Sequence, residues 1–311
     1  EHLDYKEKVP PRAVTVYSKW IKHLFKDSLL VLGSTEASMR RFVHYDYWIN
    51  DLRRPILFDS RGDILAYGPA EKQIVEIARR VKNKETIEGV EGTCIISKQV
   101  PPEFLLMPSY DEVKQSKEKF CDMQNMLSNN RNLAQKIDNR YLLQYKMPKY
   151  TSQDLDEYYE LPFTRKIPSK HMSGFEFSIV THRGCIGDCN FCALTLLQGN
   201  RVISRSEDSI IREAKRIAKM PHFKGNIDDL GGPSANMYGM DCYKCGNNCL
   251  LCAKLDRSNK RLINLMRKLR KIEGVKKVFI RSGIRYDLAS PEYLQELTQH
   301  HISGKLKIAP E

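Results

Sequence analysis

The sequence predicts an α/β chain in which a Rossmann-like half-domain precedes a partial (βα) barrel. In the first hundred residues, short apolar runs typical of strands alternate with amphipathic helical runs, as in parallel strands joined by crossover helices. The β-rich segment at 175–182 leads directly into a cysteine-rich loop. This arrangement indicates a barrel, because α/β barrels place their chemistry on loops that follow strands.

Three regions are expected: residues 1–105 as the Rossmann-like α/β region, 106–170 as a helical connector, and 171–311 as the partial barrel. The first region should contain helices at 13–25 and 71–82 and strands at 28–32, 54–58 and 63–68. Gly33 and Gly68 follow two of these strands, where doubly wound sheets bind ligands.

The barrel region should contain at most four strand–helix steps. We expect strands at 175–182, 225–230, 275–281 and 305–309, and helices at 206–220 and 291–300 with a basic helix around 262–272 between them. Ser206 is a suitable N-cap for the first of these helices. Because the chain opens on Glu1 rather than Met and stops at Pro310 and Glu311, just after a strand-like segment, we expect it to be a piece trimmed at both ends.

The most informative motif is a C-x3-C-x2-C spacing formed by Cys185, Cys189 and Cys192. Three thiolates can hold three irons of a 4Fe-4S cluster and leave the fourth iron open to a substrate or cofactor. Zinc is the alternative, but a structural zinc site normally takes four ligands, which fits this triplet poorly.

A second cysteine set lies further along the chain and comprises Cys242, Cys245, Cys249 and Cys252. Four thiolates within eleven residues predict a metal site. The two Cys-x2-Cys pairs suit tetrahedral zinc, and they equally suit a second iron–sulfur cluster. Both readings remain open.

The first motif, with Phe191 directly before its last cysteine, resembles the C-x3-C-x-aromatic-C signature of the radical S-adenosylmethionine (SAM) superfamily. The resemblance implies a 4Fe-4S cluster whose open iron chelates SAM. Reductive cleavage of SAM would then yield a 5′-deoxyadenosyl radical that abstracts hydrogen from an unknown substrate. It also implies an external one-electron reductant of the flavodoxin or ferredoxin type.

Blocks along nearly the whole chain resemble the YgiQ-type radical SAM proteins, a family that does not bring an established substrate with it. These blocks are 32–41, 44–48, 205–209, 231–238, 282–288 and 307–311.

The resemblance also implies SAM contacts. Gly231 and Gly232 stand where the superfamily has a Gly-Gly-Glu stretch, but Pro233 replaces the glutamate. Backbone contacts remain available, and Asp228 or Asp229 could supply the carboxylate. Further SAM or substrate contacts are expected from Phe191, Arg281, Ser282 and Glu311.

The first region resembles the C-terminal part of a cobalamin-binding module. The Asp-x-His-x-x-Gly signature that ligates cobalt in such modules is absent from this chain and would have to lie upstream. Cobalamin is therefore doubtful.

The chain has 311 residues, nine cysteines and a formal net charge of +13. The most basic stretch, 254–281, is best explained as the solvated outer face of a barrel helix, and the alternative is a surface for RNA or another polyanion. Seven clustered cysteines favour metal sites in a reducing, cytoplasmic compartment, and no apolar stretch is long enough for a membrane span. The alternative to an enzyme is a non-catalytic iron–sulfur or zinc protein that binds nucleic acid through its basic surface.

Overall fold

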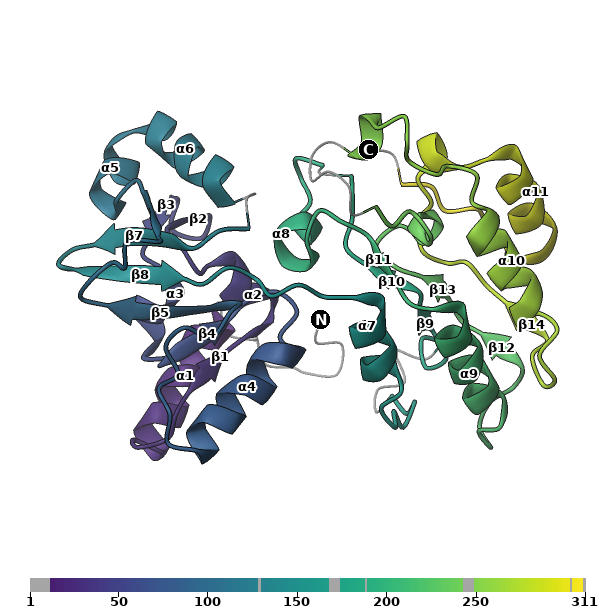
Figure 1. The fold of residues 1–311 in the computed structure, drawn as a ribbon, viewed down its shortest axis with the longest axis horizontal. Helices are drawn as coiled ribbons and strands as arrows, with labels where there is room; N and C mark the ends of the chain where they lie inside the picture. The colour runs from purple at the N-terminus through teal and green to yellow at the C-terminus, as the bar shows by residue number, and fades with distance from the viewer. Residues whose placement is uncertain are drawn as a thin grey trace. The chain divides into compact units, whose positions relative to one another are not determined.

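The protein folds as two compact α/β units that divide between Lys149 and Tyr150 (Figure 1). The computed structural model describes residues 12–127, 130–167, 174–187, 189–242, 249–302 and 304–309. The division differs from the expected boundaries near 105 and 170. The reason is that strands formed by residues 133–144, which the sequence placed in a helical connector, complete the sheet of the first unit.

The first unit is built on a six-stranded sheet in the order β1-β4-β5-β8-β7-β6. Its strands are β1 (Val31–Leu32), β4 (Ile64–Ala66), β5 (Thr93–Ser97), β6 (Leu105–Met107), β7 (Leu133–Ile137) and β8 (Arg140–Gln144). Only the β1–β4 and β6–β7 pairs are parallel. The sheet is therefore mixed: β5 runs antiparallel to both β4 and β8, and β7 and β8 form a hairpin whose turn holds Asp138 at φ 53°. The antiparallel β4–β5 pair corrects the parallel arrangement that the sequence predicted for the first hundred residues.

The helices of the first unit are α1 (Ala13–Leu24), α2 (Ser34–Met39), α3 (Ile56–Ser60), α4 (Glu71–Lys82), α5 (Tyr110–Gln115) and α6 (Lys117–Leu127), and a small ribbon joins β2 (His44–Asp46) to β3 (Asp51–Arg53). The strand expected at 54–58 is wrong. Pro55 precedes the first turn of α3, and Ile56, Leu57 and Ser60 are buried on one face of that helix. The α4 helix has the predicted bounds.

The second unit alternates strands and helices as a partial (βα) barrel requires. Its elements are α7 (Ser152–Tyr159), β9 (Ile179–Val180), β10 (His182–Arg183), α8 (Leu194–Gln198), β11 (Ile203–Ser204), α9 (Glu207–Ala218), β12 (Asn226–Ile227), β13 (Leu230–Gly231), η2 (Ala235–Met237), η3 (Cys249–Leu251), α10 (Lys260–Leu269), β14 (Lys277–Val278), η4 (Tyr286–Leu288) and α11 (Pro291–His300). The β9–β13 and β12–β14 pairs are parallel, and a parallel bridge joins Ile284 to Ile308. The helices α9, α10 and α11 connect these successive parallel segments and lie along one side of them (Figure 1).

The core of the second unit forms where these helices cover the strands. The apolar face predicted for the basic helix is buried on α10, where Leu262, Leu265, Met266 and Leu269 are fully covered. The Ser206 hydroxyl accepts a hydrogen bond from the backbone N–H of Ser209, which confirms it as the N-cap of α9. Each fully buried leucine stabilises the fold by about 2 kcal/mol, so this packing holds the loops at the strand ends in place.

Within the described part of the chain, no helix has the length and apolar character needed to cross a lipid bilayer.

Candidate functional site

The cysteine loop starts at a position that only glycine can occupy. Gly184 follows β10 with φ +80°, and a Cβ there would lie 1.8 Å from the carbonyl oxygen of Arg201. The side-chain oxygen of Gln198 accepts a hydrogen bond from the Gly184 N–H at 3.2 Å. The Cys185 N–H donates to the Gly199 oxygen, also at 3.2 Å. The chain entering the loop is therefore fixed against the residues that leave it.

The sulfurs of Cys185 and Cys189 converge on Gly187. A Cβ added to Gly187 would lie 3.3 Å from the Cys185 Sγ and 3.2 Å from the Cys189 Sγ. The Gly187 N–H also donates a hydrogen bond to the Cys185 Sγ at 3.4 Å, as backbone amides do to cluster sulfurs. This cradle of two sulfurs around a residue without a side chain fits an iron–sulfur cluster.

Cys192 is linked to the same loop through its backbone. Its N–H donates to the Cys189 oxygen at 2.9 Å, which turns the chain back before α8. Among the residues that the structure describes, no three Cys, His, Asp or Glu side chains are arranged to hold a metal ion. The assignment of Cys185, Cys189 and Cys192 as cluster ligands therefore stays a prediction.

One cysteine of the second set shares an apolar cluster with one cysteine of the first. Cys249, on η3, is buried in the same apolar cluster as Cys185, together with Met237 and Met240. Cys242 and Cys252 are half-buried. Cys245 lies outside the described residues, so this set too remains a predicted metal site, with zinc and iron–sulfur both open.

The Gly-Gly stretch predicted to contact SAM lies at the end of β13. The Gly231 oxygen accepts the Thr181 N–H at 2.8 Å, which places it in the sheet. Gly232 covers the imidazole of His182 so closely that a Cβ would approach the ring to 2.6 Å. Only glycine fits at this position, because any side chain would collide with the imidazole. Since glycine has no side chain, none shields the backbone at the end of β13.

The carboxylates of Asp228 and Asp229 accept hydrogen bonds from the neighbouring segments of the second unit. The Asp229 carboxylate accepts the backbone N–H groups of Arg281 and Ser282 at 2.7 and 3.2 Å, and the Ser282 hydroxyl also donates to it. Asp228 accepts the Phe177 N–H at 3.0 Å. These contacts give both carboxylates a structural role.

The other predicted SAM contacts differ in their surroundings. The Arg281 guanidinium donates to the Gly174 oxygen at 3.0 Å. Phe191 is 77% exposed, and Glu311 lies outside the described residues. Their contacts with a cofactor remain predictions.

His182 is completely buried beside the cysteine loop. Its Nδ1 lies 2.8 Å from the Thr181 hydroxyl. Burial lowers the pKa of His182 to about 4, so the imidazole is neutral at neutral pH.

This burial predicts a pH dependence of stability. A folded-state pKa below the ordinary value of 6.5 means that the unfolded chain binds the proton first as the pH falls. The contribution of neutral His182 is complete above pH 6.5 and declines as the pH falls toward 4. Between pH 7.5 and 5 we expect a loss of about 2 kcal/mol from this one group. Denaturant unfolding of the native protein and of His182→Asn at both pH values measures the difference, and parallel pH dependences would contradict the assignment.

Two residues of the site were not singled out from the sequence. Arg285 places its Nη1 3.7 Å from the Cys189 Sγ, and Asn236 hydrogen-bonds the backbone of Arg285 on both sides. The available signal was the pair Arg285 and Asp287, in the segment that follows β14. Asn236 and Arg285 fall within the blocks 231–238 and 282–288 that resemble the YgiQ-type proteins, but that resemblance predicts no role for either residue.

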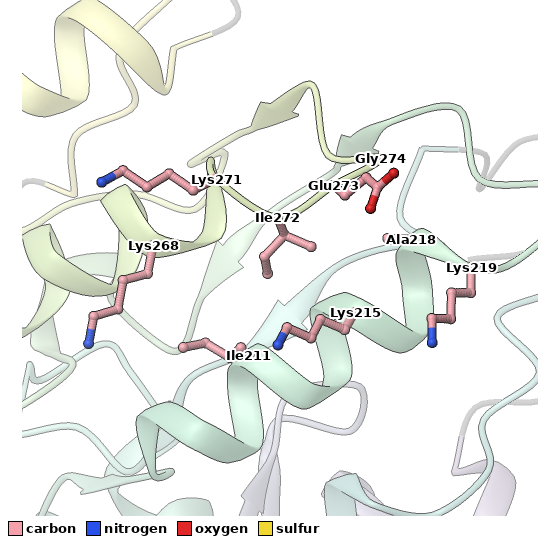
Figure 2. A pocket seen from close by; sticks show the side chains of 9 residues that line it. All are labelled: Ile211, Lys215, Ala218, Lys219, Lys268, Lys271, Ile272, Glu273 and Gly274. Atoms are coloured by element: carbon pink, nitrogen blue, oxygen red, sulfur yellow. The ribbon is translucent and has the colours of Figure 1, made fainter.

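A groove of about 720 Å³ lies between α9 and the end of α10 (Figure 2). Its apolar side chains include Ile211 and Ile272. Four lysines and one glutamate complete the lining: Lys215, Lys219, Lys268, Lys271 and Glu273. Lys268 is paired with Glu207.

The groove lies at the opposite end of the strands from the cysteine loop. It is lined by Ala218 and Gly274, which precede β12 and β14, whereas the cysteine loop follows β9 and β10. Because β9 and β13, and β12 and β14, run parallel, these two locations mark opposite strand ends. The groove can contribute to docking but not to chemistry at the cysteine loop.

In this α/β chain a cysteine loop follows β9 and β10, and a Gly-Gly turn ends β13. A sequence model described as "Radical SAM N-terminal" matches residues 3–177. The chain belongs to this radical SAM family, whose cofactors are a 4Fe-4S cluster and SAM.

Similar curated proteins carry the name UPF0313. One from Fusobacterium nucleatum is 40% identical over 98% of this chain and 59% of its own length. Another, from Methanocaldococcus jannaschii, is 41% identical over 98% of this chain and 55% of its own length. This chain therefore spans somewhat more than half of the curated relatives that it matches.

Two solved structures resemble this chain at 16% sequence identity and a TM-score of 0.48, covering 91% of it. Both are of TsrM from Kitasatospora setae, a radical SAM methyltransferase. One contains tryptophan and a SAM analogue, and the matched region makes up 42% of its TsrM chain. The other contains cobalamin and a [4Fe-4S] cluster, and the matched region makes up 43% of its TsrM chain.

Proposed function

We propose that this protein is a radical SAM enzyme whose cluster is held by Cys185, Cys189 and Cys192. When bound and reduced, the cluster would supply the electron for reductive cleavage of SAM, the chemistry by which radical SAM enzymes abstract hydrogen from a substrate. The observation that carries the proposal is the convergence of the Cys185 and Cys189 sulfurs on Gly187, in a loop that follows a strand.

The chain's own residues would prepare the site in four ways. Gly184 fixes the entry to the loop, and the Gly187 N–H stabilises the Cys185 thiolate through a hydrogen bond. Gly231 and Gly232 would present backbone to the methionine part of SAM. The tie between Asp229 and Ser282 holds the neighbouring strand end beside them.

Metal analysis and spectroscopy test this proposal on the full-length protein prepared without oxygen. About four irons per chain, or about eight if the second cysteine set also holds a cluster, are expected. Electron paramagnetic resonance should change when SAM is added, and reduced protein should release 5′-deoxyadenosine. Zinc at both sites with no iron would overturn the enzyme assignment and leave a non-catalytic metal protein.

The same measurement decides the identity of the second site. One zinc per chain besides about four irons would make Cys242, Cys245, Cys249 and Cys252 a structural zinc site.

We further propose that a flavodoxin- or ferredoxin-like protein supplies the electron and that the enzyme works in the cytoplasm, where an oxygen-labile cluster survives. Cobalamin is not part of this proposal, because its cobalt-ligating signature is absent from the chain.

The lysine groove supports RNA as a second partner, bound at a distance from the reacting centre. Because about three lysines would contact phosphates, the logarithm of the association constant should fall with the logarithm of salt concentration with a slope of about −2. Fluorescence anisotropy with a labelled single-stranded RNA measures this slope. The double variant Lys215→Glu/Lys219→Glu should bind about tenfold more weakly.

The matched control is Lys82→Glu/Lys98→Glu, which makes the same change of charge at exposed positions of the first unit. Equal weakening by both double variants would mean that net charge, and not the groove, determines binding. No measurable binding at low salt would remove RNA as a partner.

A further inference from the structure

Arg285 brings a guanidinium to the cysteine loop. Its Nη1 lies 3.7 Å from the Cys189 Sγ, and the same atom lies 2.8 Å from the position of a Cβ on Gly187. The residue is only 5% exposed. A buried positive group therefore lies against the cradle formed by the two sulfurs.

The orientation of Arg285 is fixed from two directions. Asp287 accepts hydrogen bonds from its Nε at 3.0 Å and its Nη2 at 2.7 Å. This fork-to-carboxylate pairing has planar, bidentate geometry. It occupies one edge of the guanidinium while Nη1 faces the sulfur.

The backbone of Arg285 is held by a fully buried asparagine. The Asn236 Nδ2 donates to the Arg285 oxygen at 2.8 Å, and its Oδ1 accepts the Arg285 N–H at 2.9 Å. Asn236 lies four residues after Gly232. One side chain thus connects the Gly-Gly turn to the arginine at the cysteine loop.

We propose that Arg285 is a positioning residue that donates a hydrogen bond to the Cys189 sulfur and raises the reduction potential of the cluster. This inference rests on the proposed function, because it needs the cluster at Cys185, Cys189 and Cys192. Reduction adds one electron, and therefore negative charge, to the cluster and its thiolates. Hydrogen bonds to the sulfurs stabilise the reduced form more than the oxidised form, and groups that hydrogen-bond to metal ligands also hold these ligands in orientation.

The test is a redox titration followed by electron paramagnetic resonance on the anaerobic full-length protein. In Arg285→Gln the ratio of reduced to oxidised cluster at a fixed solution potential should fall about tenfold, which for one electron is a shift of 59 mV toward negative potential. Arg285→Lys keeps a positive charge but cannot hold Asp287 and the sulfur together. Its shift should have the same direction and be smaller.

Arg267→Gln is the matched control. Arg267 lies on α10 in the same unit, and its Nε pairs with Glu296 at 2.8 Å. Its titration should coincide with that of the native protein. Iron content measured on every variant separates a change of potential from a loss of cluster.

The outcomes separate the two proposals. A native protein without iron and without a response to SAM would refute the proposed function. A native protein with a SAM-responsive cluster, whose potential is the same in Arg285→Gln and Arg285→Lys, would overturn the role of Arg285 alone. If Arg285→Gln does not fold, the titration of Arg285→Lys decides, and a potential equal to the native value overturns the role.

Discussion

Replacing any one of Cys185, Cys189 and Cys192 by alanine is expected to remove the iron of the first site and abolish SAM cleavage. A cluster that depends on three protein thiolates is not held by two. Removal of Cys185 also eliminates the sulfur that accepts the Gly187 N–H. Iron content and release of 5′-deoxyadenosine under reducing conditions measure the effect, which should reach the detection limit of the assay.

Cys121→Ala is the control for this prediction, because Cys121 is an exposed free thiol on α6 in the other unit. It should keep native iron content and activity. Cys242→Ala should leave the spectrum of the first cluster unchanged if the two sites are independent. Full SAM cleavage by Cys189→Ala would show that the ligands have been assigned to the wrong cysteines.

Gly184→Ala is expected to be among the most destabilising single substitutions in the second unit. The residue has φ +80°, which costs an alanine about 1 kcal/mol, and the new Cβ would meet a backbone oxygen 1.8 Å away. Backbone must therefore move, which adds about 2–3 kcal/mol. Denaturant unfolding should show a loss of about 3–4 kcal/mol, accompanied by loss of iron because the displaced loop carries the cysteines.

Gly199→Ala separates the cost of the backbone conformation from the cost of the steric contact with Arg201. Gly199 has φ +91°, but nothing lies within 4 Å of the Cβ that alanine would add. With φ +91° and ψ 162°, Gly199 has a backbone conformation that essentially only glycine adopts, so this variant should lose about 2 kcal/mol, less than Gly184→Ala, and keep its iron. Equal losses in Gly184→Ala and Gly199→Ala would mean that the contact with Arg201 is relieved at no cost.

The helices of the barrel region were predictable because their signals are local. Ser206 caps α9, Pro291 opens α11, and the apolar residues of α10 recur at helical spacing. The strands were predicted too long. Their observed lengths depend on hydrogen bonds to neighbouring strands, which a single segment does not encode.

The hairpin of β7 and β8 was missed for a related reason. Its residues are mixed polar and apolar, and they adjoin a true helix, α6, so the stretch was assigned to a helical connector. The turn at 138–139, between runs that contain Leu133 and Leu142, was the local signal for a hairpin.

Part of the candidate site could likewise be anticipated from sequence. The cysteine spacing and the Gly-Gly pair can be recognised from the sequence, because few other residue types can ligate iron or allow so close an approach to the backbone. Arg285 and Asn236 do not, since arginine and asparagine occur everywhere and their importance arises only from a contact across 49 positions of the chain.

The burial of Cys185 and Cys249 with Met237 and Met240 has a consequence for handling the protein in air. Oxidation of either methionine would insert a polar sulfoxide into the apolar packing shared by both cysteine sets. Oxygen damage would then persist after iron and sulfide are restored. Treatment with methionine sulfoxide reductase before reconstitution is the appropriate repair.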